Sequence, residues 1–223
     1  MSDATANRWD LYGPIHKGLR RAHALMLLRI GNADFTGDTS GLLADLRRHL
    51  AISADHLHHE EQYIHPPLKA RVPHATDRLE DQHQHHREHF LALFEQIEAI
   101  EAGDSSAPAG RRLYRLFTRF VADDLGHMAE EEEITFPILC HHFTDAELQA
   151  IERAIVEDMD PDLAGPVTEA MLAATNIDER VTLLSGMRQG MPAEIYTYLF
   201  HAAVRPTASA ADLQRLAHLG LAA

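Results

Sequence analysis

The feature that most constrains this chain is a helical pattern that occurs twice, 71 residues apart. In both copies a His-x-x-x-Glu pair is followed by a proline six residues after the Glu, and the apolar positions keep the same offset. The matching residues are His56, Glu60, Pro66, Leu42 and Leu46 in the first copy and His127, Glu131, Pro137, Leu113 and Phe117 in the second. This shared register indicates one helical hairpin used twice, which predicts a pseudo-twofold helical bundle.

Apolar residues recur at three- and four-residue spacing in four long segments, which is typical of amphipathic α-helices. The segments cover residues 14–31, 40–65, 76–102 and 108–137. We expect the second helix to stop before Pro66, because proline lacks an amide hydrogen and restricts the residue that precedes it. No segment alternates with period two. The pattern therefore predicts an all-α fold, an up-down four-helix bundle.

The helical segments become shorter after the fourth helix, and prolines and glycines separate them. We therefore expect a bundle over residues 1–140 and a C-terminal helical extension over residues 141–223. The apolar faces of the extension need to be covered, either by the bundle or by a second copy of the chain. The second arrangement would be a homodimer formed through the C-terminal helices.

Two capping boxes indicate where helices of the extension begin. Thr144 is followed three residues later by Glu147, and Asn176 is followed in the same way by Glu179. In such a pair each side chain accepts a hydrogen bond from the other residue's backbone amide, which satisfies the first turn of a helix. The predicted short helices end near 159 and 190, and two more cover 192–204 and 209–219.

Composition excludes several classes of partner. The chain has 20 Lys and Arg against 34 Asp and Glu, and the resulting net charge of -14 repels the phosphates of nucleic acids. No apolar run approaches the roughly 18 residues of a membrane-spanning helix. The single cysteine, Cys140, cannot form an internal disulfide. We therefore expect a cytoplasmic protein with no membrane or nucleic-acid partner.

The two His-x-x-x-Glu pairs are the strongest indication of chemistry among the 17 histidines. Residues four apart share one face of a helix, so His56 and Glu60 direct a nitrogen and a carboxylate into the same space. His127 and Glu131 do the same, and both pairs lie on apolar stripes. Burial of a carboxylate without a partner costs several kcal/mol, so a cation should lie between the pairs. The alternative is a buried hydrogen-bond network without metal.

Further ligands are expected on the other two helices. His16 opens the apolar stripe of the first helix, and His83 has the matching place on the third. His86 is an alternative ligand from the third helix, or else a hydrogen-bonding partner of a ligand. Four imidazoles and two carboxylates, with each carboxylate able to bridge two metals, suit iron or manganese better than a lone zinc.

These motifs resemble those of the hemerythrin-like family, also called HHE cation-binding domains. The resemblance covers residues 12–139 and is carried by the two stretches 56–61 and 127–131 with their following prolines. It implies two non-haem iron ions bridged by carboxylates, and a small diatomic ligand. The expected function is binding or sensing of dioxygen, nitric oxide or redox state, which leaves open whether the protein is an enzyme.

The sequence departs from the oxygen carriers of that family at Leu79, where they have a further histidine one turn before the third-helix ligand. This departure favours sensing or redox chemistry over oxygen transport. Iron storage, iron donation for repair of iron-sulfur clusters, or a di-iron oxidase such as a ferroxidase are the alternative functions. We expect His23 and His49 to serve in packing. His85 and His89 lie off the apolar stripe, and we expect them to be solvated or to assist the ligands.

Overall fold

The computed structural model describes residue 5 and residues 7–223, and it contains helices but no strand in that part of the chain. The predicted all-α class is confirmed. The chain divides into two compact units, an N-terminal unit of Met1–Tyr12 and Ala22–Met159 and a C-terminal unit of Gly13–Arg21 and Asp160–Ala223. No helix in the described residues combines the length and the apolar character needed to cross a membrane.

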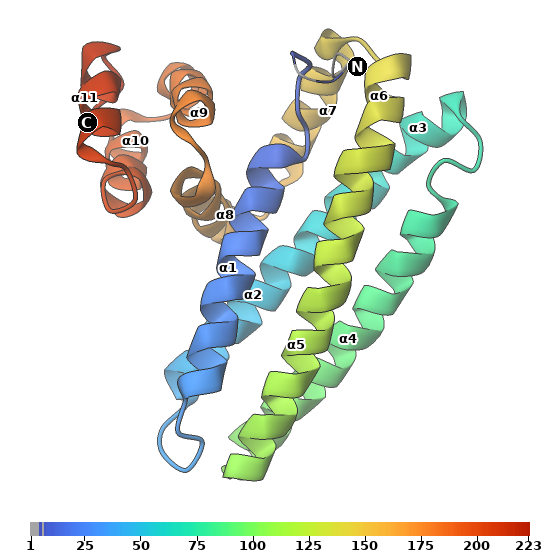
Figure 1. The fold of residues 1–223 in the computed structure, drawn as a ribbon, viewed down its shortest axis with the longest axis vertical. Coiled ribbons are helices and arrows are strands. Elements are labelled where there is room, and N and C mark those ends of the chain that lie inside the picture. The colour runs from blue at the N-terminus through green and yellow to red at the C-terminus, as the bar shows by residue number, and fades with distance from the viewer. Residues whose placement is uncertain (1–4, 6) are drawn as a thin grey trace. The chain divides into compact units, whose positions relative to one another are not determined.

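Four long helices contribute to the main core of the N-terminal unit. They are α1 (Gly13–Asn32), of which the part from Ala22 belongs to this unit, α2 (Ser40–His59), α4 (Asp77–Glu101) and α5 (Ala107–Glu130). Figure 1 shows α2, α4 and α5 running alongside one another. Each of the four helices contributes large buried side chains, such as Ile30, Leu50, Ile97 and Phe117. The predicted apolar stripes therefore meet in one hydrophobic core.

The prediction that the second helix ends before Pro66 is wrong. After α2 the backbone continues through a π-helical turn, η1 (Glu60–Ile64), into α3 (His65–Arg71). The amide of His65 donates to the carbonyl of Glu60, five residues earlier, and Pro66 and Pro67 then fall in the first turn of a new α-helical segment. A first turn needs no intrahelical amide donors, so the prolines are tolerated there.

The same sequence of turns recurs at the end of α5. A second π-helical turn, η2 (Glu131–Thr135), leads into α6 (Phe136–His142), again with proline in the first turn. Glu131 follows Glu60 by 71 residues and Thr135 follows Ile64 by the same number, so the sequence repeat is also a repeat of local backbone structure. Short π-helical segments within α-helices are rare and frequently occur at functional sites.

A smaller apolar cluster of the N-terminal unit lies at and after these two turns. It includes Ile64, Leu68, Phe136 and Leu139, together with Leu148 of α7 (Asp145–Asp158). The predicted capping box of Thr144 and Glu147 is present at the start of α7. Contacts thus group α7 with the N-terminal unit, whereas the predicted boundary at residue 140 lies within α6.

The C-terminal unit has a core of its own. Its helices from residue 160 on are α8 (Pro161–Ala174), α9 (Ile177–Gly190), α10 (Ala193–Leu199), which continues into the π-helical turn η3 (Phe200–Val204), and α11 (Ala210–His218). The second predicted capping box is present at the start of α9. Leu172, Leu184, Leu199 and Leu216 are buried together. Much of the apolar surface of these helices is therefore buried within the unit, and the predicted homodimer stays a prediction.

A buried arginine and a glycine help the helices of this unit to pack together. Arg180 is buried, and its Nε donates to the carbonyl of Leu172 near the end of α8, while its Nη2 donates to Thr207 Oγ1. A Cβ atom at Gly18 would lie 3.1 Å from the backbone of Ala170, so glycine allows α1 and α8 to pack at backbone distance.

Candidate metal centre

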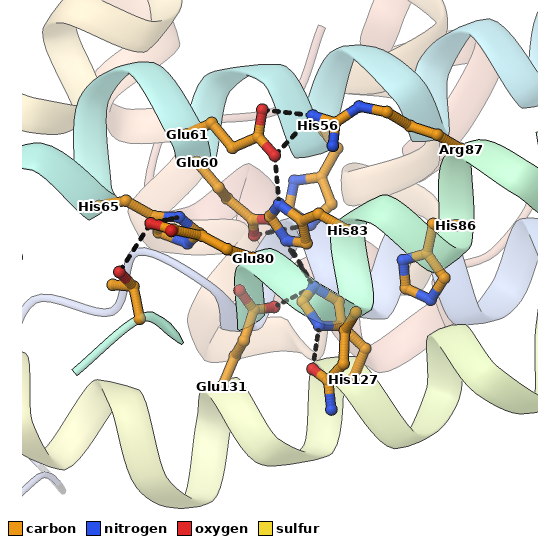
Figure 2. Close-up of polar contacts among 12 residues, drawn as sticks. His56, Glu60, Glu61, His65, Glu80, His83, His86, Arg87, His127 and Glu131 are labelled. Carbon is orange, nitrogen blue, oxygen red and sulfur yellow. Dashed lines mark hydrogen bonds and ion pairs between the residues drawn. The ribbon is translucent and has the colours of Figure 1, made fainter. Parts of the chain in front are cut away.

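Two carboxylates and two imidazoles from four different segments converge within the N-terminal unit. Glu60 begins η1, Glu131 begins η2, His83 lies on α4 and His127 lies on α5. Each side chain offers one ligand atom, and the four atoms all lie within 4.8 Å of one another. Figure 2 shows the four side chains pointing toward one another. At most 1% of the surface of each residue is exposed, so the site is closed to bulk water.

Three of the distances between these donor atoms match those around a single metal ion, and the fourth, between His127 Nε2 and Glu60 Oε2, is longer at 3.8 Å. His83 Nε2 lies 3.1 Å from His127 Nε2 and 3.3 Å from Glu60 Oε2, and His127 Nε2 lies 3.4 Å from Glu131 Oε2. Two ligands held about 2.1 Å from one ion at angles of 90–110° are about 3.0–3.4 Å apart. The four groups are therefore spaced to bind one ion without a large rearrangement.

A hydrogen-bonded chain fixes which nitrogen of His127 faces the site. Gln82 Nε2 donates to Glu130 Oε2 at 2.9 Å, and Glu130 is also paired with Arg78. The amide oxygen of Gln82 therefore faces His127 Nδ1, at 2.8 Å, and an amide oxygen can only accept. His127 must donate from Nδ1, which leaves the Nε2 lone pair directed toward the carboxylates.

His83 is oriented by an equivalent chain on the other side. Its Nδ1 donates to Glu61 Oε1 at 3.0 Å, and Arg87 Nη2 donates to the same carboxylate at 2.6 Å (Figure 2). A ligand histidine commonly donates its second N–H to a carboxylate or carbonyl in this way. Both Nε2 lone pairs thus face two carboxylates and each other, an arrangement that requires a proton or a metal ion between them.

The electrostatics of the site favour positive charge. Burial by itself would lower the pKa of His127, but the carboxylates of Glu131 and Glu60 outweigh burial and raise the pKa to about 9. Burial acts on His83 in the same sense, and there too the hydrogen bond with Glu60 raises the pKa above its ordinary value. A site that stabilises a proton so strongly on an imidazole will also stabilise a metal cation in its place.

Glu60 and Glu131 also belong to a second grouping of ligand atoms. His56 Nε2 lies 3.1 Å from Glu60 Oε1, while His83 faces the other oxygen, Oε2. The ligand atoms of His56, Glu60 and Glu131 lie within 4.8 Å of one another. Each carboxylate is therefore shared between a group that contains His56 and a group that contains His83 and His127.

These buried His and Glu side chains could hold a metal ion. Comparison of the chain with family models, curated proteins and solved structures found no match. Imidazole nitrogen with carboxylate oxygen suits iron, manganese or zinc, whereas calcium and magnesium prefer oxygen ligands alone.

Two further ligands were predicted, His86 and His16. His86 is buried beside His127, with ring centroids 5.0 Å apart, but its Nδ1 faces Asp124 at 3.8 Å. His83, and not His86, is the α4 residue that groups with the carboxylates. His16 is fully buried in the Gly13–Arg21 part of α1, which belongs to the C-terminal unit, and its role as a ligand stays a prediction.

The histidines expected to serve only in packing form a buried polar network. His23 Nε2 donates to Asp124 Oδ2 at 2.7 Å, and His23 Nδ1 lies 2.8 Å from His49 Nε2. Burial by itself would raise the pKa of Asp124, but the hydrogen bond from His23 outweighs it and lowers the pKa to about 2. Asp124 lies on the apolar stripe of α5 together with His127 and Glu131, so the sequence pattern already indicates its burial.

Lowering the pH should destabilise the protein partly through His49. Burial, assisted by His23, lowers the pKa of His49 from 6.5 to about 3. Between these two pH values the unfolded chain binds a proton at His49 and the folded chain does not. The contribution of His49 to the free energy of unfolding is complete above pH 6.5. It decreases as the pH falls and is smaller by about 2 kcal/mol at pH 5. Urea unfolding at pH 7 and pH 5 should show a smaller loss for His49→Gln than for the wild type. Equal losses would contradict a buried, neutral His49, and exposed His58→Gln is the control.

Loss of the Gln82 carbonyl should weaken metal binding although Gln82 touches no ion. In Gln82→Leu the Nδ1 hydrogen of His127 has no acceptor, and the Nε2 lone pair is no longer fixed toward the site. We expect metal affinity, measured by competition with a calibrated chelator, to fall about 10- to 100-fold. Gln62→Leu changes an exposed glutamine on η1 and should have no effect. Wild-type affinity in Gln82→Leu would show that this hydrogen bond does not orient the ligand.

Proposed function

We propose that this protein is a non-haem di-iron protein that binds or senses dioxygen, nitric oxide or redox state. The observation that carries the proposal is the sharing of Glu60 and Glu131 between two ligand groups. A carboxylate that faces imidazoles through both of its oxygens is suited to bridge two ions. The four long helices of the N-terminal unit are then the up-down bundle of a hemerythrin-like protein.

The number and type of ligands favour iron. A single zinc ion would be satisfied by the four ligands Glu60, His83, His127 and Glu131, and would give His56 no role. Two ions that share the carboxylates give His56 a role as well. We retain His16 as a further ligand because of its sequence register alone. The ligand count per ion then remains below six, which leaves room for a small exogenous molecule.

The enclosure of the site limits what it can bind. His83, His127, Glu60 and Glu131 are all buried, and so are the apolar residues Ile64, at the end of η1, and Phe136, directly after η2. A diatomic molecule can enter such a core through small fluctuations, whereas a larger substrate would need an open pocket. When bound, iron would supply the ability to bind a diatomic ligand and to change oxidation state.

The chain's own residues set the conditions for that chemistry. Glu61 and Gln82 hold the two imidazoles with their Nε2 atoms toward the carboxylates that would bind the ions, and Arg87 and Arg78 neutralise the carboxylates behind them. Leu79 is buried and apolar at the position where an oxygen carrier would have another histidine. With fewer imidazole ligands, sensing or redox chemistry is favoured over reversible oxygen transport.

An optical titration tests this function. Iron(II)-loaded protein prepared without oxygen should develop a charge-transfer absorption band when dioxygen or nitric oxide is added, and the band should be absent in the metal-free protein. Disappearance of the band on removal of the gas would indicate reversible capture. Oxidation without recovery would indicate redox sensing. An iron-loaded protein whose spectrum responds to neither gas would exclude the proposed function.

A further inference from the structure

A second group of metal-ligating side chains lies on the outside of the N-terminal unit, apart from the buried carboxylates. His85 and His89 are one turn apart on α4, and Asp123 is on the adjacent helix α5 (Figure 1). His89 Nε2 lies 2.7 Å from Asp123 Oδ2, and His85 Nε2 lies 3.6 Å from the same oxygen. One ligand atom from each residue lies within 4.8 Å of the other two.

The geometry of this cluster is that of a partly assembled coordination sphere. Histidines four residues apart on a helix present their rings on one face, and here the ring centroids are 4.7 Å apart. His85 Nδ1 lies 3.4 Å from Glu88 Oε2, so that carboxylate can accept the Nδ1 hydrogen and leave Nε2 toward Asp123. This is the same division of roles that Glu61 imposes on His83 in the buried site.

Exposure and charge also suit a cation from solution. The side chains of His85 and Asp123 are 57% and 48% exposed, so an ion can arrive directly and complete its coordination with water. His89 is 14% exposed, which restricts its motion and reduces the entropy lost on binding. The net charge of -14 attracts cations to the surface as a whole.

We propose that His85, His89 and Asp123 form a surface site for a divalent transition-metal ion such as Zn²⁺, Ni²⁺ or Cu²⁺. Two imidazoles and one carboxylate select these ions over Mg²⁺ and Ca²⁺, which prefer oxygen ligands. Binding requires the Nε2 hydrogen that His89 shares with Asp123 to move to Nδ1, so that Nε2 can ligate. The bound ion would link α4 to α5.

The test uses Zn²⁺ itself as the probe. Full-length protein without an affinity tag, with its buried site loaded beforehand, is titrated with Zn²⁺ in an isothermal calorimeter. We expect one additional site of micromolar affinity, at least tenfold weaker in His89→Gln and in Asp123→Asn. His74→Asn removes an exposed histidine that is also paired with a carboxylate, Asp77, and should leave binding unchanged. Thermal melts of each variant establish that it is folded.

The outcomes separate this site from the buried one. Zn²⁺ binding that persists in Glu131→Gln but disappears in His89→Gln would support the surface site whatever the buried site holds. Unchanged Zn²⁺ affinity in both His89→Gln and Asp123→Asn would place the ion elsewhere and overturn the proposal. Wild-type protein that binds no further Zn²⁺ below millimolar concentration would show that the cluster is only a solvated hydrogen-bonded group. Addition of excess Mg²⁺ should not displace the Zn²⁺.

Discussion

Replacement of Glu131 by Gln is expected to remove almost all iron from the protein. Glu131 belongs to both ligand groups, and the substitution keeps its size while removing the negative charge and one acceptor oxygen. Loss of a residue that only supports a ligand costs about 10- to 100-fold in metal affinity, so loss of a bridging ligand should cost more than about 100-fold. The variant should contain less than about a tenth of the wild-type iron.

Iron in this variant is measured by elemental analysis after expression in iron-rich medium. Glu133→Gln provides the matched control, because Glu133 is an exposed residue of the same acidic run. It should contain as much iron as the wild type. If Glu131→Gln retained wild-type iron while folding normally, the carboxylate ligands would have to lie elsewhere.

Removal of the metal should lower the thermal stability substantially. Without a metal ion, only protons on the imidazoles of His83 and His127 offset the charge of the two buried carboxylates, in a site closed to water. A ligand present at about 1,000 times its Kd stabilises the folded state by about 4 kcal/mol. For a chain of this size that corresponds to a decrease of about 10 °C in Tm on chelation.

Melting curves followed by circular dichroism, with and without a strong chelator, measure this difference. Glu131→Gln should melt at the same temperature in both conditions, since it binds little metal. It should also be at least as stable as the chelated wild type, because it lacks one buried negative charge. Identical wild-type melts with and without chelator would show that no metal contributes to stability.

The positions of the long helices could be predicted because a single physical pattern, the apolar stripe, determines them. The path of the backbone beyond Glu60 and Glu131 could not. A general rule for proline predicts a helix end at Pro66, but the rule assumes hydrogen bonds between residues four apart. In the π-helical turn the hydrogen bonds join residues five apart, and no residue type in the sequence predicts such a turn.

The C-terminal unit shows a different limit. Capping boxes identified α7 and α9 because their hydrogen bonds are local. α8 was not predicted, and it contains Pro166 in its interior. The pairing of α8 with the start of α1 depends on Gly18, which is far from it in sequence. Contacts of that kind follow from packing and are not encoded in a local pattern.

The candidate site was predictable in its ligands more than in its surroundings. The four-residue spacing on one helix face predicted that His56 and Glu60 act together, and the repeat predicted the second pair. Gln82 and Glu61 were missed as orienting residues because their roles depend on how α4 sits against α5 and η1. The choice between His83 and His86 also required the rotation of α4 about its axis, because both residues lie on its buried face.

Elemental analysis of the wild-type protein tests the central claim most directly. Untagged protein from iron-rich medium, dialysed against metal-free buffer, should retain about two iron ions per chain through Glu60 and Glu131, as carboxylate-bridged di-iron sites in helical bundles do. A protein that retains no metal, or a single zinc ion in place of iron, would contradict the account.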